Sequence, residues 1–272
     1  MKKIELGETG LKVSRLCYGT EPFTFKKGPP GRRTQGDKSS LEGGQILAEA
    51  VKLGVNFWDT SDDYGTHPHV AEGLKRVKRS DVIVSDKSNA ATREEGYKAV
   101  EAALNDLGTE YVDIMFLHIV PYEGVWRTNS QNESYYSASL DERKGALKGY
   151  LEAKDSGMIK ATALSTHSTR VLRKVVDEPD IDVVCTTLNK THDYIDEGSL
   201  HEHIAAINAV KDSGKAVYVI KVLSAGALRD DAEGAIRYAL QFKDFIDAWN
   251  IGMYDVQDVR RNITIFDAVL GD

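Results

Sequence analysis

Two hydrophobic patterns alternate along the chain. Short runs rich in β-branched and aromatic residues predict strands, at 16–20, 55–58, 81–85, 111–118, 159–165, 182–188, 216–223 and 246–252. After each run, hydrophobic residues recur every three or four positions, which predicts an amphipathic helix. These helical segments span 40–54, 69–77, 92–108, 141–157, 168–176, 199–214, 231–240 and 256–270. The pattern therefore predicts eight consecutive strand–helix units.

Eight such units over about 250 residues are typical of a (β/α)8 TIM barrel, an α/β fold. Gly54, Gly108, Gly157 and Gly214 stand just after predicted helices, where a left-handed cap is favoured. The stretches KKIEL and LKVSR flank a GETG turn and predict an N-terminal β-hairpin. A doubly wound open sheet is the alternative, but no G-x-G-x-x-G follows any predicted strand. We find no linker or low-complexity tract, so residues 1–272 are interpreted as one domain.

Composition and charge restrict the class of function. Hydrophobic residues make up 41% of the 272, enough for one large core, and the formal net charge is −7. This acidic balance argues against a surface that binds nucleic acid or an anionic membrane. Cys17 and Cys185 show neither zinc nor disulfide spacing and are expected to be reduced thiols. We see no signal-peptide core and no apolar run near the roughly 20 residues that span a bilayer, and we expect a cytoplasmic protein.

Titratable residues stand at the ends of three successive predicted strands. In a TIM barrel the active site lies at the carboxyl ends of the strands. The second predicted strand ends at Asp59, with Tyr64 in the loop that follows; the third ends near Lys87 and the fourth at His118. A single strand-end lysine or histidine is often structural, but this combination on consecutive strands predicts a site.

The chemistry of these four side chains is that of a proton donor. A free phenol has a pKa of about 10 and is a weak acid at neutral pH. An ammonium group beside Tyr64 is expected to lower that pKa, and Asp59 to hold Lys87 in place. Tyr64 then serves as a general acid for a carbonyl oxygen, while His118 hydrogen-bonds the same oxygen and orients the substrate.

With these residues in view, the sequence resembles the aldo-keto reductase superfamily. The matching stretches are LGETGLKVSRLCYGT, GVNFWDTSDDYG, VIVSDKSN, VDIMFLH, GMIKATALSTHS, IKVLSAGAL and AIRYALQF…NIGMYDVQDVRRNI. The resemblance implies a catalytic tetrad of Asp59, Tyr64, Lys87 and His118. It also implies reduction of aldehydes or ketones by NADPH or NADH, bound without a Rossmann motif. The wording STHS and IKVLSAG is most similar to a bacterial branch that often carries an iron–sulfur segment, which is absent here.

The resemblance also implies a set of cofactor-binding residues. Two positions differ from those of the family, because the usual carboxamide-binding asparagine and glutamine are replaced by Thr166 and Cys185. Ile220 takes the place of the aromatic ring that often stacks on the nicotinamide. The implied cofactor-binding residues are Gly19, Thr20, Ser165, Thr166, Ile220, Lys221, Leu223, Gly226, Gly252, Met253 and Asn262.

The preference between NADPH and NADH stays open at this point. The family alone favours NADPH. The basic residues that many NADPH-preferring members carry at the adenosine end are replaced here by Met253 or Tyr254 and by Asp258, which favours NADH. Arg260 and Arg261 lie close enough in the sequence to reach a 2′-phosphate.

Two alternative functions and one loop complete the sequence-based hypotheses. The first alternative is a slow or non-catalytic cofactor sensor or partner-binding barrel. The second is a metal-dependent hydrolase that uses His67, His69, His118 and Asp59. The pair His201 and His203 is interpreted as a surface feature of a helix. Residues 121–140 are expected to form a long loop whose side chains either line the substrate pocket or lie on the surface, namely Trp126, Arg127, Tyr135 and Tyr136.

Overall fold

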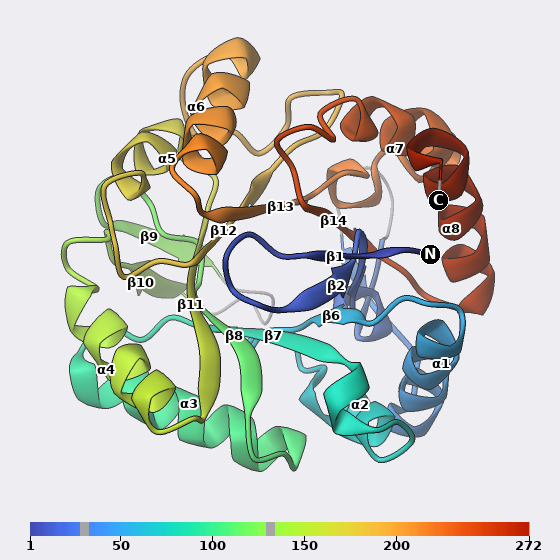
Figure 1. Cartoon of the computed structure of the whole chain (residues 1–272), viewed down its shortest axis with the longest axis horizontal. Coiled ribbons are helices and arrows are strands. Elements are labelled where there is room, and N and C mark those ends of the chain that lie inside the picture. Colours follow the sequence, from blue (N-terminus) through green and yellow to red (C-terminus); the bar gives the residue numbers. More distant parts are fainter. Residues whose placement is uncertain (28–32, 129–133, 272) are drawn as a thin grey trace.

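Eight parallel strands close into a barrel, and eight α-helices surround it (Figure 1). The computed structural model describes residues 1–27, 33–128 and 134–271. The strands follow one another around the barrel in chain order, and the last pairs with the first. They are β3 (Leu16–Gly19), β6 (Phe57–Asp59), β7 (Ile83–Ser88), β8 (Val112–Leu117), β11 (Ile159–Thr166), β12 (Val183–Thr187), β13 (Ala216–Ile220) and β14 (Ala248–Gly252). The predicted TIM barrel is confirmed.

The predicted helices are also confirmed, and local sequence explains where several begin. Three of them begin with a capping box, at Ser39, Thr92 and Ser199. The hydroxyl group of each accepts from the N–H of a glutamate three residues later, and the carboxylate of that glutamate accepts from the N–H of the capping residue. Gly54 and Gly108 adopt the left-handed conformation expected after a helix. The helices are α1 (Ser40–Lys52), α2 (His67–Leu74), α3 (Arg93–Leu107), α4 (Lys144–Asp155), α5 (Thr169–Val175), α6 (Leu200–Asp212), α7 (Ala232–Leu240) and α8 (Val256–Leu270).

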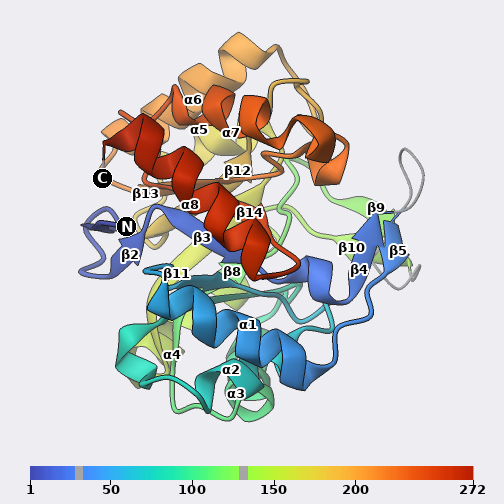
Figure 2. The same ribbon diagram turned by 90° about the vertical axis from the view of Figure 1, so that its right-hand side faces the viewer.

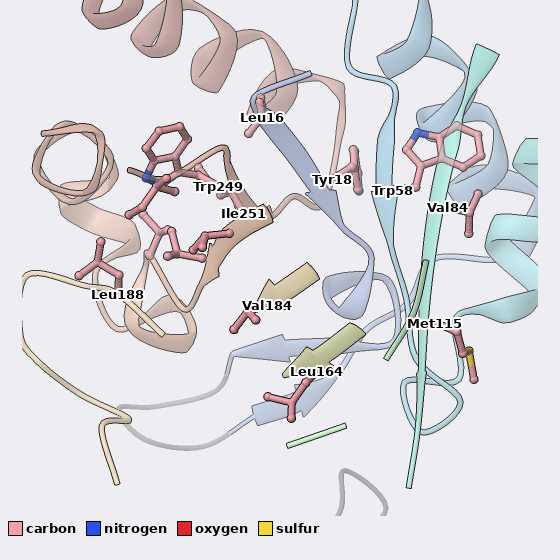
Figure 3. Close-up of a cluster of buried hydrophobic side chains, with 14 of the residues drawn as sticks. Leu16, Tyr18, Trp58, Val84, Met115, Leu164, Val184, Leu188, Trp249 and Ile251 are labelled. Carbon is pink, nitrogen blue, oxygen red and sulfur yellow. The ribbon is translucent and has the colours of Figure 1, made fainter. Parts of the chain in front are cut away.

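The hydrophobic core has two shells, because successive side chains of a strand point to opposite faces. The outer shell lies between strands and helices and contains Leu16, Trp58 and Trp249 (Figure 3). The inner shell fills the barrel, where the ring of Phe57 packs edge-on against that of Tyr218. Cys17 and Cys185 belong to this inner shell as free thiols, as predicted.

The two ends of the barrel differ in character. The predicted hairpin, β1 (Lys3–Glu5) and β2 (Lys12–Ser14), lies across one end and adds Leu6 and Leu11 to the inner shell (Figures 1 and 2). Two further hairpins stand at the opposite end: β4 (Phe25–Lys27) with β5 (Arg33–Gln35), and β9 (Val125–Thr128) with β10 (Ser134–Ser137) (Figure 2). The strands end on this second side, which is where barrel chemistry is expected.

Two predictions are corrected by the fold. Segment 121–140 is not a plain loop, because β9 and β10 form an antiparallel ribbon within it; residues 129–133 lie outside the described residues. His203 is not on the surface, since it is fully buried and hydrogen-bonded to Thr169 and Thr186.

Within the described parts of the chain, none of the helices has both the length and the apolar character needed to cross a membrane.

Candidate active site

Strand alternation directs three of the four predicted residues into the barrel. Phe57 points into the inner shell, so Asp59, two residues later, has the same direction. Phe116, on β8, likewise points into the inner shell and precedes by two residues His118, which stands just past the end of that strand. Asp59, Lys87 and His118 are all at most 3% exposed. Three strand ends therefore bring three polar side chains to one place beneath the rim.

Asp59 is held by four hydrogen bonds from side chains on three barrel strands, β7, β13 and β14. Its Oδ2 accepts from Lys87 Nζ at 2.7 Å and from Asn250 Nδ2 at 2.6 Å. Its Oδ1 accepts from Ser85 Oγ at 2.7 Å and from Tyr218 Oη at 2.8 Å. The carboxylate is thus fully engaged and fixed in direction. Sequence reasoning missed Ser85, Tyr218 and Asn250, although Tyr218 and Asn250 are polar groups in otherwise apolar strands.

Lys87, Tyr64 and His118 form one contact cluster with Asp59. Lys87 Nζ also donates to the carbonyl oxygen of Thr60 at 2.6 Å, and it lies 5.1 Å from the centre of the Tyr64 ring. The rings of Tyr64 and His118 meet edge to face, with centroids 5.9 Å apart. The structure therefore brings all four predicted residues together.

The protonation states of the cluster follow from burial and charge. Burial alone lowers the pKa of the Lys87 ammonium, but Asp59 outweighs this and holds that pKa above its ordinary value. Loss of water, together with the charges of Glu21 and Asp59, raises the pKa of the Tyr64 phenol well above 10.0. The prediction that Lys87 lowers the pKa of Tyr64 is therefore wrong in this structure, since loss of hydration and nearby carboxylates dominate.

A buried arginine fixes the main chain around His118. Arg143 is 1% exposed, and its guanidinium donates to three carbonyl oxygens: His118 at 2.8 Å, Ser88 at 2.6 Å and Ala90 at 2.8 Å. Burial and the positive charges of Lys87 and Arg143 lower the pKa of His118 well below its usual range. The imidazole is consequently neutral at pH 7.

A cavity of about 510 Å³ opens beside the tetrad, within the usual range for small-molecule sites. Tyr64 and Asn250 line it, so it reaches the cluster around Asp59. Several predicted cofactor-binding residues line it as well: Gly19, Ile220, Lys221, Leu223, Gly226 and Gly252. Gly19 and Gly252 face each other across β3 and β14, and a Cβ at Gly19 would lie 2.4 Å from Asn250 Oδ1. Close approach of the two strands here requires glycine.

The charged residues of the cavity wall are arranged in pairs. Arg261 lies 2.9 Å from Asp258 and Arg229 3.5 Å from Asp230. Lys221 Nζ lies 3.9 Å from Glu21, across the cavity. Sequence reasoning missed Glu21, Arg229 and Asp230, which come from connecting segments. The positively charged side chains of the cavity wall therefore each have a carboxylate close by.

The turn after β13 carries unusual backbone geometry. Lys221, Ser224 and Ala225 have φ values of 61°, 46° and 49°, in the left-handed region that non-glycine residues avoid. Gly226 follows with a φ of 87°. Such strain concentrates at functional sites, where the surrounding structure maintains it. These residues line the cavity, apart from Ser224, which donates to the Asp193 carboxylate.

The remaining predicted cofactor-binding residues do not line the cavity. The hydroxyl of Thr20 donates to the main-chain oxygen of Asp59 at 2.9 Å. Met253 and Asn262 are buried, and Asn262 Nδ2 is a buried donor without a hydrogen-bond partner among the described residues. Ser165 and Thr166 lie at the end of β11 and are at most 2% exposed.

Both hydroxyl groups expected to face the nicotinamide amide are engaged by the main chain. Ser165 Oγ accepts from the N–H of Ile119 at 2.8 Å. Thr166 Oγ1 donates to the carbonyl oxygen of Val120 at 2.7 Å. Cys185 is fully buried, and burial raises the pKa of its thiol. In this structure, therefore, none of these three side chains is positioned in advance to hydrogen-bond a nicotinamide carboxamide.

The residues of the proposed metal-dependent hydrolase do not converge. His67 lies between two carboxylates, with Nε2 3.1 Å from Asp86 and Nδ1 3.1 Å from Asp106. His69 Nε2 is 2.9 Å from the carbonyl oxygen of Lys38. Among the residues that the structure describes, the grouping with metal-ligand spacing consists of Asp62, Asp63 and His118. It includes neither His67 nor Asp59.

The aromatic residues of segment 121–140 lie mainly on the surface. Trp126 is 71% exposed and Tyr136 44%. Arg127 lies 3.1 Å from Asp196, which offsets its charge and removes the reason to expect an anionic substrate. Tyr135 is partly buried.

Comparison with known proteins gives a family match and several similar proteins. The model of the aldo/keto reductase family matches residues 15–247. The L-galactose dehydrogenase of Arabidopsis thaliana is 34% identical over 138 residues, 45% of this chain and 40% of that protein. The NADH-specific methylglyoxal reductase of Escherichia coli K12 is 24% identical over 87% of this chain and 73% of that protein.

Solved structures support the same fold. An aldo-keto reductase from Bacillus halodurans superimposes with a TM-score of 0.73 at 18% identity, over 98% of this chain and 91% of that one. The chain spans about half the length of several of the curated relatives that it matches.

Proposed function

This chain belongs to the aldo/keto reductase family, and we propose that it reduces the carbonyl group of small aldehydes and ketones to an alcohol with Tyr64 as the proton donor. The observation that carries the proposal is the cluster of Asp59, Lys87, Tyr64 and His118 beside the cavity. The reduced nicotinamide, when bound, supplies the hydride. The protein's own residues bind the reactants, orient them and deliver a proton to the carbonyl oxygen.

Tyr64 is suited to deliver that proton at the end of hydride transfer. Its raised pKa keeps the phenol protonated at neutral pH. The oxygen of the carbonyl group becomes alkoxide-like as hydride arrives, and an alkoxide is a stronger base than a phenolate. The ammonium of Lys87, 5.1 Å from the ring centre, stabilises the phenolate that is left behind. Asp59 keeps Lys87 charged and in position.

The cavity is suited to the diphosphate and adenosine parts of a nicotinamide cofactor. Gly19 and Gly252 provide room for a close approach to main chain, and Lys221 carries a positive charge at its wall. Met253 and Asn262 lie beneath the adenosine end, and the buried Asn262 Nδ2 is a donor suited to a base nitrogen. Ile220 lines the cavity near Tyr64 and offers an apolar surface for the nicotinamide.

We propose NADH rather than NADPH as the preferred cofactor, which reverses the expectation from the family alone. Asp258 lies in the cavity wall and also accepts a hydrogen bond from the N–H of Tyr254 at 3.0 Å. A carboxylate can accept a hydrogen bond from the 2′-hydroxyl of a ribose but repels a 2′-phosphate. Arg261 is paired with Asp258, so its charge is largely offset. In Asp258→Asn the preference for NADH, measured as the ratio of the affinities for NADH and NADPH, is expected to fall about tenfold, because the carboxylate that repels the 2′-phosphate is removed.

Small polar carbonyl compounds are the proposed substrates. Curated relatives of the chain are named for L-galactose, D-xylose, glyceraldehyde and methylglyoxal. The side chains of Ser61, Asp62 and Asp63 beside His118 give this part of the site a polar, acidic character that disfavours anionic substrates. We retain the cytoplasm as the proposed location.

Two measurements test this function. Titration with NADH and NADPH, followed by the fluorescence of the reduced nicotinamide, measures cofactor binding. Steady-state consumption of the cofactor on a panel of small aldehydes measures turnover. The proposal expects saturable binding together with turnover that is lost in Tyr64→Phe. Binding without any difference in turnover between the two proteins would contradict it.

A cofactor sensor is the second candidate, favoured by one observation. The hydroxyl groups of Ser165 and Thr166 are engaged by the main chain, so the nicotinamide ring is less firmly oriented for hydride transfer. This candidate expects tight cofactor binding with the same low turnover in the natural protein and in Tyr64→Phe.

A further inference from the structure

The imidazole of His167 is buried beside the active site without a hydrogen bond. His167 follows β11 directly and is 9% exposed. Its main-chain oxygen accepts from the N–H of Asp196, but neither ring nitrogen has a hydrogen-bond partner within residues 1–27, 33–128 and 134–271. Buried polar groups are normally paired, and a neutral imidazole has one donor and one acceptor. Both nitrogens of this ring are therefore available to a bound molecule.

Strand alternation turns His167 towards the axis of the barrel. Ala161 and Ala163 on β11 point into the inner shell, and His167 lies in the same alternating series. The charges around the ring agree with this direction. Burial and the cations Lys221 and Arg127 hold the pKa of His167 well below its usual range, so the imidazole is neutral, and Lys221 belongs to the cavity wall.

The register of the strands sets His167 level with another part of that wall. Thr166 pairs with Thr186, and the next residue of β12, Thr187, pairs with Ile220. Because His167 follows Thr166, it stands at the same height as Ile220, two strands away. Neighbouring strands are about 4.8 Å apart, so roughly 10 Å separates the two main chains around the rim. This is the span of a small planar ring with one polar substituent.

Packing against Tyr194 holds the imidazole without engaging its nitrogens. The two rings meet edge to face, with centroids 6.2 Å apart, and Lys221 Nζ lies 6.0 Å from the centre of the Tyr194 ring. Tyr194 has a φ of 68°, in the left-handed region that bulky residues avoid. Backbone strain of this kind concentrates at functional sites. The loop after β12 thus fixes His167 beside the cavity.

We propose that His167 is a cofactor-binding residue whose imidazole hydrogen-bonds the carboxamide group of the nicotinamide. An amide has both N–H donors and a carbonyl acceptor, so it can pair with either tautomer of the ring. The hydroxyl groups of Ser165 and Thr166 do not offer this contact, because the main chain engages both. The inference rests on the proposed function, since it takes a nicotinamide cofactor as the ligand of the cavity.

Calorimetric titration of the full-length protein measures this contact without any turnover. ADP-ribose has every part of NADH except the nicotinamide ring. We expect His167→Phe, which keeps an aromatic ring, to bind NADH about tenfold more weakly than the natural protein does, the effect of one lost hydrogen bond. Its affinity for ADP-ribose should be unchanged, which also shows that the variant is folded.

Two further variants and one spectrum sharpen the test. His167→Gln restores a donor and an acceptor and should recover most of the affinity for NADH. The control His201→Phe, at an exposed histidine, should leave both affinities unchanged. In the natural protein labelled with ¹⁵N, saturation with NADH should shift the ring-nitrogen NMR signals of His167, and saturation with ADP-ribose should not.

The outcomes separate this inference from the proposed function. Equal affinities for NADH in the natural protein and His167→Phe, or an equal loss for NADH and ADP-ribose, would overturn the role of His167 alone. An effect confined to the KM of an aldehyde would overturn it as well, because the imidazole then meets the substrate. If the natural protein does not bind NADH, the proposed function is contradicted and the role of His167 with it.

Discussion

Two parts of the barrel rim use polar side chains in opposite ways. On β6, β7, β13 and β14, polar groups hydrogen-bond one another: Lys87, Ser85, Tyr218 and Asn250 all donate to Asp59. At the end of β11, polar groups hydrogen-bond the main chain instead, as Thr166 does with Val120. The first arrangement fixes the direction of charged side chains, and the second stabilises the loop next to them.

The difference shows that a polar residue at a strand end has no fixed role. Asp59 and Thr166 are each the last residue of a barrel strand, and both side chains are buried. Asp59 requires charged and neutral donors from other strands because a buried carboxylate must be paired. Thr166 has a single hydroxyl group, which a nearby carbonyl oxygen satisfies. We therefore expect substitutions in the first part to affect catalysis and those in the second to affect stability.

The largest effect is expected for Tyr64→Phe. Removal of the proton donor should lower kcat by about 10²- to 10⁴-fold, the usual contribution of a general acid. The affinity for the reduced cofactor should change little, because the ring remains. Steady-state kinetics and a fluorescence titration measure the two quantities. Tyr122→Phe, at an exposed tyrosine, is the control. A kcat within threefold of the natural value would contradict the role of Tyr64.

Asp59→Asn should destabilise the protein by about 3 kcal/mol, because it leaves the ammonium of Lys87 buried without its counter-charge. Unfolding by urea measures this loss. The exposed pair Lys98 and Glu94 provides a comparison, and Glu94→Gln should cause no measurable change. Equal stabilities of Asp59→Asn and the natural protein would mean that the buried pair adds nothing to the barrel.

Stability should fall at alkaline pH because of His67. Burial lowers the pKa of this imidazole, but Asp86 and Asp106 outweigh burial and raise the pKa to about 9. Since the folded-state pKa exceeds the unfolded one, the contribution is fully present below pH ~6.5 and is lost as pH rises through ~9. The size of this contribution to stability is on the order of 3 kcal/mol.

The change with pH is measured by urea unfolding between neutral and alkaline pH, in the natural protein and in His67→Gln. The variant should lose most of the dependence. His203 is the matched control: burial lowers its pKa, so it is neutral across this range, and His203→Gln should keep the same alkaline fall. An identical pH dependence in His67→Gln would contradict the assignment.

The smallest effect is expected for Thr166→Val, on the other side of the rim. The carbonyl oxygen of Val120 loses its donor, which should cost about 1 kcal/mol of stability. Cofactor affinity should stay within about twofold, since the hydroxyl group is already engaged. A tenfold loss of affinity would instead show that Thr166 contacts the nicotinamide amide.

The sequence predicts much of the fold because the fold depends on periodicity. The runs around Phe57, Phe116 and Tyr218 are strands with alternating inner and outer side chains, as their pattern indicates. The same alternation places Asp59 and His118 inside the barrel. The chain order of the strands then brings these residues together, so the cluster was predictable from the residues alone.

Other features depend on which strands face each other across the barrel. Asn250 on β14 and Tyr218 on β13 reach Asp59 from strands two and three places away around the barrel, and no local pattern reports that distance. The pKa of Tyr64 depends on a balance between lost hydration and several charges, and the sequence suggested only the charge of Lys87. The strands in segment 121–140 are short, exposed and polar, so they lack the alternation that marks the barrel strands.

The central claim is that hydride passes from a nicotinamide cofactor to a carbonyl carbon in this barrel. It is tested most directly with a reduced cofactor that carries deuterium at its transferable C4 position, incubated with the protein and glycolaldehyde. We predict that mass spectrometry finds one deuterium in the alcohol product, and that Tyr64→Phe forms far less of it. An alcohol without deuterium, or no alcohol although the cofactor binds, would contradict the claim.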